Sequence, residues 1–264
     1  MNKPKKSLGQ NFLRDKIVLD KIIQSANLSA DDFVIEIGPG EGVLTEELVR
    51  VAKKVIAIEI DKNLASRLDS LRQLADSQNK VEIINADVLE INLPELLKQN
   101  NFKNYKVIAN IPYYITSPII RLFLETAYPP TEMLLMVQKE VAERICAKAG
   151  KLSILALSVQ YYADAGLLFT VPRTAFFPVP EVDSAVIRIT LNKKRDEKEV
   201  VKKFFKIVKA GFSAKRKTLV NNLSSSLKLE KSLVEKKLKQ IEISQNQRAQ
   251  ELSLEDWKKL AELI

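Results

Sequence analysis

The residues with the most specific chemistry are Asn110, Ile111, Pro112 and Tyr113, which follow an apolar run at 106–109. The amino nitrogen of a nucleobase is a poor nucleophile because its lone pair is delocalised into the ring. The side-chain oxygen of the asparagine and the carbonyl of Ile111, fixed by Pro112, could accept hydrogen bonds from the amino group and draw that lone pair out of conjugation. Tyr113 could stack on the base, a contact worth about 1–3 kcal/mol. This predicts methyl transfer by positioning and electrostatics, without a strong general base; the alternative is a turn whose tyrosines pack in the core.

Three glycines spaced two residues apart follow an apolar, β-branched run at residues 33–37. Gly38, Gly40 and Gly42 indicate a strand, a tight turn and the start of a helix, where a backbone without Cβ atoms can approach a ligand closely. The alternative is an ordinary strand-to-helix turn. The spacing differs from the G-x-G-x-x-G pattern of dinucleotide sites, and Pro39 lies inside it, which counts against a nicotinamide-dependent dehydrogenase.

Carboxylates near this turn indicate which nucleotide it could hold. Glu36 and Glu41 flank the glycines and would repel a pyrophosphate, whereas they suit a ligand with an amino group and a sulfonium. Glu59 lies about 20 positions past the first glycine, the spacing that places a carboxylate on a ribose. Asp87 follows the next apolar run and could accept from an adenine amino group. These residues predict a site for S-adenosylmethionine; the alternative is that the last two are solvent-exposed strand ends.

Aromatic and basic residues later in the chain could contact a nucleic acid. Phe177 lies in a proline-stiffened stretch at 176–180 and would supply a second stacking face for a base; core packing is the alternative. Lys215, Arg216 and Lys217 would form a phosphate-contacting start of a helix, and the alternative is a solvated surface.

The composition excludes several classes of enzyme. The 264 residues include no histidine and one cysteine, which excludes Ser-His-Asp and Cys-His catalysis, an internal disulfide and a cysteine-cluster zinc site, so we expect no metal. No segment approaches the roughly 18 uninterrupted apolar residues of a membrane helix. The first ten residues are basic but lack the apolar stretch of a secretory signal, so we expect a cytoplasmic protein without a membrane partner.

Strands alternating with helices must position these residues, which predicts a parallel sheet with helices on both faces. We expect strands at 33–37, 55–60, 81–85, 106–109 and 133–137, late strands at 167–171 and 184–190, and helices at 15–27, 61–77, 116–126, 139–148 and 152–162, besides one after the glycine turn. Thr116, Ser117 and Pro118 are expected to cap the helix that they begin. The carboxyl ends of parallel strands bind ligands, and Gly38 and Asn110 close two of them.

After a charged run that begins near residue 192, the sequence has only helical patterns separated by short loops. This predicts two domains, at 1–192 and 193–264. The second part holds 19 lysine and arginine residues against 10 aspartate and glutamate residues, whereas the first holds 23 of each. The net charge of +9 therefore lies in a helical C-terminal domain, for which a polyanion is the natural partner.

Four ordered motifs, at residues 9–13, 36–40, 110–113 and 177–180, together resemble those of the rRNA adenine N6-dimethyltransferases. The resemblance runs essentially end to end. It implies an α/β protein, a Rossmann-like class I S-adenosylmethionine-dependent methyltransferase sheet with helices on both faces, plus a small all-α C-terminal domain that docks on rRNA. It also implies a catalytic role for Asn110, Ile111, Pro112, Tyr113 and Phe177. The cofactor contacts that it implies are Asn11, Leu13, Gly38, Gly40, Glu59, Asp87 and Asn110.

This family has two main bacterial branches. One dimethylates two adjacent adenines in the 3′-terminal hairpin of 16S rRNA during maturation of the small subunit, and the other dimethylates one adenine of 23S rRNA and confers macrolide resistance. Residues 116–118, 180–184 and 215–223 resemble the 16S branch, although Ile111 stands where leucine is common. The resemblance thus implies a monomeric enzyme whose partner is 16S rRNA in an immature 30S subunit. A non-catalytic RNA-binding factor in 30S assembly is the alternative of another class.

Overall fold

The computed structural model describes residues 4–5, 8–69, 80–192 and 195–264, and its chain forms two compact units. The first unit comprises Met1–Ala142 and Asp164–Leu191, and the second comprises Glu143–Ala163 and Asn192–Ile264. One of the divisions falls between Leu191 and Asn192. The segment at 143–163 differs from the expected 1–192 domain, because it packs with the C-terminal helices: Leu157 and Tyr161 belong to their apolar core.

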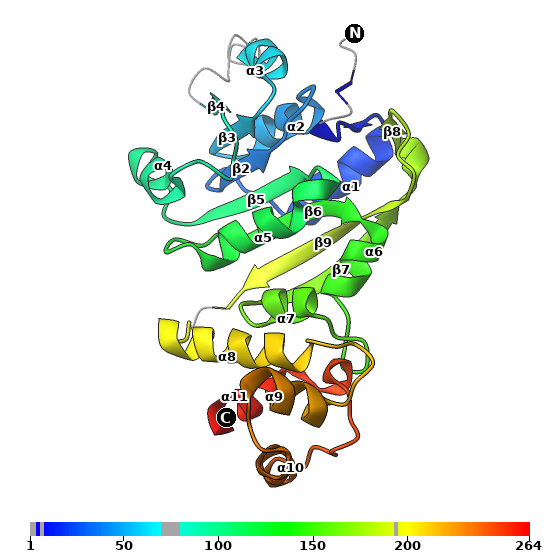
Figure 1. Ribbon diagram of the computed structural model, residues 1–264. Coiled ribbons are helices and arrows are strands. Elements are labelled where there is room, and N and C mark those ends of the chain that lie inside the picture. The colour runs from blue at the N-terminus through cyan, green and yellow to red at the C-terminus, as the bar shows by residue number, and fades with distance from the viewer. Residues whose placement is uncertain (1–3, 6–7, 70–79, 193–194) are drawn as a thin grey trace. The chain divides into compact units, whose positions relative to one another are not determined.

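A mixed sheet of seven strands organises the first unit (Figure 1), in the order β4-β3-β2-β5-β6-β9-β7. The strands are β2 (Phe33–Ile37), β3 (Lys54–Glu59), β4 (Val81–Asn85), β5 (Tyr105–Asn110), β6 (Glu132–Gln138), β7 (Ala163–Val171) and β9 (Ser184–Leu191). The pairs from β4 to β6 are parallel, as expected, and β9 joins β6 antiparallel. The order along the chain reverses between β2 and β5, and a ligand binds at such a switch point in open sheets.

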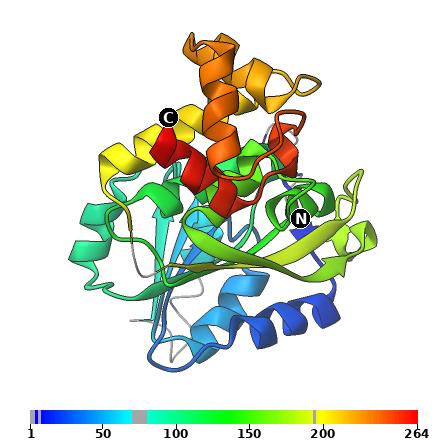
Figure 2. The same ribbon diagram turned by 90° about the horizontal axis from the view of Figure 1, so that it is seen from below.

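Helices lie on both sides of this sheet (Figure 2), as the sequence predicts. They are α1 (Lys16–Ala26), α2 (Val43–Val51), α3 (Lys62–Leu68), α4 (Leu93–Gln99), α5 (Thr116–Glu125) and α6 (Lys139–Ile145). Apolar residues of α1, α2 and α3 share one core with alternate residues of the strands, among them Val34, Val55 and Ile108. The intervening residues Ile35 and Ile56 are fully buried on the opposite face.

The structure differs from the expectations at the start of α5 and in the segment before β5, and one further expectation is described only in part. The expected cap of α5 is wrong, since the N-cap is Ile115 and the Thr116 hydroxyl donates instead to the carbonyl of Tyr113 at 3.2 Å. A short 3-10 helix, η3 (Tyr113–Ile115), already begins the turn ahead of α5. The expected helix at 61–77 appears as α3, and residues 70–79 lie outside the described residues. Helix α4 was not expected.

Two strands of only two residues were also missed, and they join distant parts of the first unit. Strand β1 (Phe12–Leu13) pairs antiparallel with β8 (Phe176–Phe177), so that Phe12 lies opposite Phe177. The backbone N–H groups of Arg14 and Asp15 extend this contact, because both donate to the carbonyl of Ala175. The N-terminal motif therefore lies beside the aromatic stretch at 176–180.

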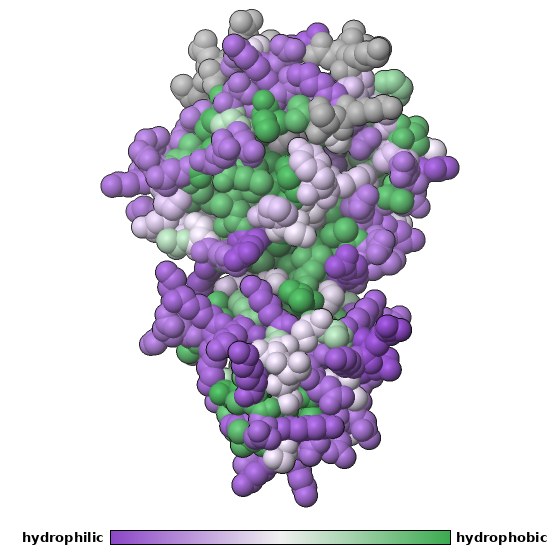
Figure 3. Space-filling model, in the orientation of Figure 1, coloured by the Kyte–Doolittle hydropathy of each residue, from purple (hydrophilic) through white to green (hydrophobic). Residues whose placement is uncertain are grey.

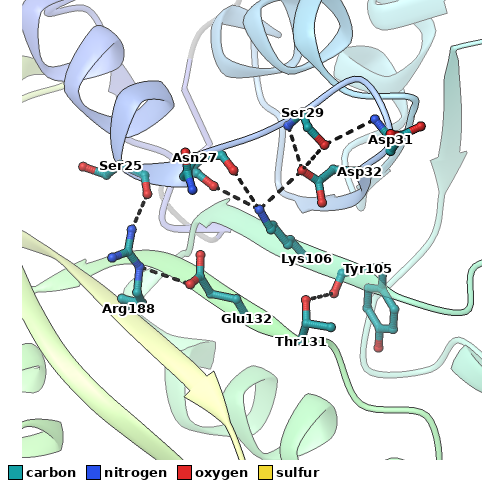
Figure 4. A network of polar contacts seen from close by, with 11 residues as sticks. Ser25, Asn27, Ser29, Asp31, Asp32, Tyr105, Lys106, Thr131, Glu132 and Arg188 are labelled. Carbon is teal, nitrogen blue, oxygen red and sulfur yellow. Dashed lines mark hydrogen bonds and ion pairs between the residues drawn. The ribbon is translucent and has the colours of Figure 1, made fainter.

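The helix that follows β1 is anchored at its other end by two cations (Figure 4). The ammonium of Lys106 donates to the carbonyls of Ala26 and Asn27 at 3.3 and 2.9 Å, and Arg188 donates to the carbonyl of Ser25. Cations stabilise the C-terminus of a helix, where carbonyl groups have no helical partner. This fixes α1 and, through it, the N-terminal segment.

The second unit is all α, as expected. Its helices are α7 (Ile154–Gln160), α8 (Lys198–Gly211), α9 (Leu219–Leu227), α10 (Lys231–Gln240) and α11 (Leu254–Leu263). They bury Trp257 and Phe204, and a Cβ at Gly211 would lie 2.3 Å from the Trp257 ring, so only glycine fits there. On the face seen in Figure 3, hydrophilic residues cover most of α8 and α10. Among the described residues, no helix is long and apolar enough to cross a membrane.

Candidate functional site

One pocket in the first unit gathers every residue expected to contact the cofactor, at the carboxyl ends of the parallel strands. These residues are Asn11, Leu13, Gly38, Gly40, Glu59, Asp87 and Asn110. They come from the N-terminal segment and from the ends of β2, β3, β4 and β5, so the shared edge that the sequence predicts brings them together.

The glycine turn forms one wall of the pocket. Gly38, Gly40 and Gly42 all have positive φ angles, of 65°, 61° and 87°, which L-residues with side chains rarely adopt. The N–H of Gly40 donates to Glu59 Oε2 at 3.0 Å. A Cβ at Gly40 would lie 3.1 Å from the ring of Phe12, so glycine also allows β1 to close against the turn.

Glu59 is held at the end of β3 with only 4% of its surface exposed. Its Oε1 accepts from the N–H of Asp61 at 2.9 Å, and its Oε2 accepts from Gly40. Burial raises the pKa of the carboxyl, and these backbone hydrogen bonds partly oppose that shift. Each oxygen keeps a further lone pair that could accept from a ribose hydroxyl.

The charges beside the turn differ from the expectation. Glu36 is 1% exposed, and burial, together with the nearby charge of Glu59, raises its pKa to about 8, so it is mostly protonated at neutral pH. Glu41 forms an ion pair with Arg14 at 2.6 Å. The argument from two free carboxylates is therefore wrong. The described residues that line the pocket include no lysine or arginine.

Asn110 ends β5 at the rim of this pocket. Its Nδ2 donates to the carbonyl of Asn11 at 3.2 Å, which leaves Oδ1 to accept from an incoming N–H group. The next residue, Ile111, is buried, and its N–H donates to the carbonyl of Met136 at 3.1 Å. Pro112 lines the pocket directly. The backbone around Asn110 is thus fixed by the neighbouring strand β6.

The two aromatic residues expected at the base lie at the border of the pocket, not in its lining. Tyr113 is half-buried, and its hydroxyl lies 2.8 Å from the buried hydroxyl of Ser184. Burial raises the pKa of Tyr113, although the Ser184 contact acts against this. Phe177 is 54% exposed, so core packing does not describe it, and it pairs with Phe12, which lines the pocket.

Sequence reasoning missed several residues that build the pocket. Gln10 and Tyr114 line it, and Gln10 donates to Asp61 at 3.1 Å. Lys5 forms an ion pair with the same carboxylate at 3.0 Å. Burial acts to raise the pKa of Asp61, but the hydrogen bonds of Lys5 and Gln10 outweigh it and the pKa is lowered. The only sequence signal for these contacts is the glycine-containing polar run ahead of the first helix.

The basic run at 215–217 belongs to the second unit. All three side chains are exposed in the turn that precedes α9, ahead of its N-cap Thr218. Asn222 is 2% exposed, and its Nδ2 donates to the carbonyls of Gly211 and Ala214 at 2.6 and 3.0 Å, which holds this turn in place. Its contact with RNA stays a prediction.

No group of three or more potential metal-ligating side chains is found in the described part of the chain. The pocket itself offers backbone N–H groups, carboxylates and side-chain amides.

The parallel strands, the glycine turn after β2 and the carboxylate at the end of β3 define a class I methyltransferase. A 23S rRNA methyltransferase, ErmE, superposes with a TM-score of 0.76 at 29% identity, covering 96% of this chain and 99% of that structure. A dimethyladenosine transferase from Plasmodium falciparum superposes with a TM-score of 0.79 at 27% identity, covering 94% and 95%.

The chain belongs to the ribosomal RNA adenine dimethylase family, whose model matches residues 1–264. A protein of Fusobacterium nucleatum named ribosomal RNA small subunit methyltransferase A is 47% identical over 99% of this chain and 97% of its own length. A protein of the same name from Dehalococcoides mccartyi is 44% identical over 98% of this chain and 87% of its own length.

Proposed function

We propose that this protein uses S-adenosylmethionine to dimethylate the N6 amino groups of two adjacent adenines in the 3′-terminal hairpin loop of 16S rRNA. One observation supports this most: Asn110 lines the same pocket as Gly38, Glu59 and Asp87, which lie at the ends of three other strands and are expected to contact the cofactor. Family membership supplies the substrate class.

The described residues of the pocket fit S-adenosylmethionine. When bound, this cofactor supplies the methyl group. Glu59 offers free lone pairs to ribose hydroxyls, and Asp87 lies beyond β4, where it could accept from an adenine amino group. Glu36 Oε2 is buried and has no hydrogen-bond partner among the described residues, so it could exchange a hydrogen bond with a bound ligand.

The residues at the rim would prepare the target amine. Asn110 Oδ1 accepts a hydrogen bond from the N6 amino group. This draws the lone pair of the N6 nitrogen out of the ring, so that it can attack the methyl group. The carbonyl of Ile111 accepts from the second amino hydrogen, on a backbone fixed by the contact with Met136. Tyr113 and Phe177 hold the extruded base from the border of the pocket. The acceleration then comes from orientation and preorganised acceptors.

The relatives favour the small-subunit branch of the family. Proteins named ribosomal RNA small subunit methyltransferase A are 42% to 47% identical over nearly the whole chain, whereas ErmE is 29% identical. A 23S rRNA substrate is the second candidate, supported by the likeness to ErmE. We further propose that the protein acts as a monomer in the cytoplasm on an immature 30S subunit, with the basic residues at 215–217 contacting RNA phosphates.

Transfer of radiolabelled methyl groups to ribosomal particles tests this proposal. Immature 30S particles from a strain that lacks the enzyme should accept the label from S-adenosylmethionine. The same particles should accept almost none with an Asn110→Ala variant, because the acceptor for the amino group is removed. Label in 23S rRNA or free 50S precursors alone would support the second candidate and overturn the first.

A further inference from the structure

An exposed tyrosine at the pocket has no assigned role. Tyr114 is 57% exposed, yet it lines the same pocket as Asn110. Its neighbour Tyr113 points its hydroxyl to Ser184, so the two adjacent tyrosines serve different parts of the site. The contacts of Tyr114 lead instead to the N-terminal segment.

The ring of Tyr114 packs on the backbone of Gly9. A Cβ at Gly9 would lie 3.3 and 3.4 Å from the Cδ1 and Cε1 atoms of Tyr114 and 3.9 Å from the Cβ of Pro112. Gly9 also has a φ of 60°. A side chain at residue 9 would therefore press on the ring carbons of Tyr114, and the positive φ also favours glycine there.

Two hydrogen bonds connect this contact to the catalytic amide. Asn11 Nδ2 donates to the carbonyl of Gly9 at 3.2 Å, which closes a turn at residues 9–11. The carbonyl of Asn11 in turn accepts from Asn110 Nδ2 at 3.2 Å. A carbonyl can accept only from the NH₂ end of the amide, so the turn determines which end of the Asn110 side chain faces the target.

The geometry points to Tyr114 as a positioning residue for methyl transfer. Its ring holds the turn at 9–11, and the turn holds Asn110 with Oδ1 toward the amino group. This inference rests on the proposed function for its substrate. Without the turn, the Asn110 amide could rotate and point its NH₂ group at the NH₂ group of the adenine, where an acceptor is needed. Misplacement of this kind reduces rates by about 100-fold.

The rest of the segment stays anchored when the ring is removed. Lys5 and Gln10 contact Asp61 on one side, and Phe12 pairs with Phe177 on the other. Removal of the ring should therefore loosen the turn without unfolding the segment. Glu59 keeps its contacts with Gly40 and Asp61. Asn11 belongs both to the turn and to the pocket lining, so cofactor affinity should fall, but by less than kcat.

Four variants test the inference: Tyr114→Phe, Tyr114→Ala, Gly9→Ala and the double variant Gly9→Ala/Tyr114→Ala. Tyr128→Ala is the matched control, since Tyr128 is 60% exposed in the same unit. Each is measured for kcat and KM with the RNA substrate and for cofactor Kd by calorimetry. Exchange of the Asn110 side-chain amide protons is followed by NMR, with Asn110→Asp to assign the signal.

We expect Tyr114→Ala to lower kcat by about 10- to 100-fold, with a smaller change in cofactor Kd and faster exchange of the Asn110 amide. Tyr114→Phe and the control should behave as wild type, because the hydroxyl makes no part of the contact. Gly9→Ala should lower kcat as well. The double variant should be no slower than the slower single variant, because both act on one contact.

A wild-type kcat for Tyr114→Ala, or amide exchange unchanged from wild type, would overturn the inference. A rise in KM for RNA alone would also overturn it, since Tyr114 would then contact RNA. Full additivity in the double variant would show that the two residues act separately. Failure of the proposed function looks different, because the wild-type protein itself would then transfer no methyl group to rRNA.

Discussion

Asn110 can act as an acceptor because its amide is oriented from one side by the carbonyl of Asn11. Two glutamates beside the glycine turn add little net negative charge, because Glu36 is mostly protonated at neutral pH and Glu41 is paired with Arg14. Glu59 is the buried carboxylate that faces the pocket with spare hydrogen-bonding capacity. The site thus holds a protonated, an ion-paired and a buried pocket-facing carboxyl group, and substitutions at single residues can test these states.

Glu59→Ala separates cofactor binding from particle binding. Glu59 is buried and holds Gly40, and in the proposed site it accepts from ribose hydroxyls. Its removal should therefore weaken cofactor binding by about 10- to 100-fold. Association with 30S particles should remain. Calorimetry with S-adenosylmethionine and co-sedimentation with 30S particles measure the two, and Glu125→Ala, an exposed carboxylate on α5, is the control.

Loss of both properties together would show that they are not separable. Retention of cofactor binding would remove Glu59 from the site. A catalytically silent assembly factor, by contrast, would tolerate Glu59→Ala in every cellular assay of subunit maturation.

Glu36→Gln tests the protonation state of the buried carboxyl. Its pKa is about 8 in the folded protein and 4.5 as the ordinary value, so the folded state holds one more proton than the unfolded state between these values. Stability must then fall as pH rises from 5 to 8, by at most about 1.4 kcal/mol per pH unit for this group. The variant lacks this pH-dependent decrease. Urea unfolding of both proteins at pH 5 to 8 measures the difference, and parallel curves would contradict the assignment.

At the scale of elements, the sequence predicted the five parallel strands well because each is a short apolar, β-branched run bounded by turn residues. The placement of Glu59, Asp87 and Asn110 in one pocket follows from that alone. The pairing of β1 with β8 could not be predicted, since two strands of two residues carry no periodicity and their contact is between distant segments. The protonated state of Glu36 also depends on burial by α1 and α2, which no local pattern reports.

The turn before α9 is the element that we expect to contact phosphates. Replacing Lys215, Arg216 and Lys217 with Gln should weaken binding to 30S particles. The slope of log K against log salt should fall by about one for each phosphate that the variant no longer neutralises. Filter binding between 50 and 200 mM salt measures the slope.

A matched control removes the same charge from the first unit, by Gln at the exposed lysines 21, 98 and 103. Its salt slope should stay close to that of the wild type. Equal salt slopes for the wild type and the variant at 215–217 would contradict the docking role of this turn. An equal fall of the slope in the control would show that net charge alone, and not this turn, determines the salt dependence.

At the scale of the whole molecule, chemistry and charge are divided between the two units. The pocket lies in the first unit, and its described lining includes no basic residue. The net charge of +9 comes from the chain beyond residue 192. If the basic residues at 215–217 contact RNA as proposed, the residues that choose the target lie outside the pocket that holds Asn110.

The nucleotides modified in the labelled particles test the central claim most directly. After reaction of the wild-type protein with immature 30S particles, 16S rRNA is digested and mapped by mass spectrometry. The account predicts N6,N6-dimethyladenosine at two adjacent positions in the 3′-terminal hairpin, and none with Asn110→Ala. Methylation at a single adenine of 23S rRNA, or at any atom other than adenine N6, would contradict it.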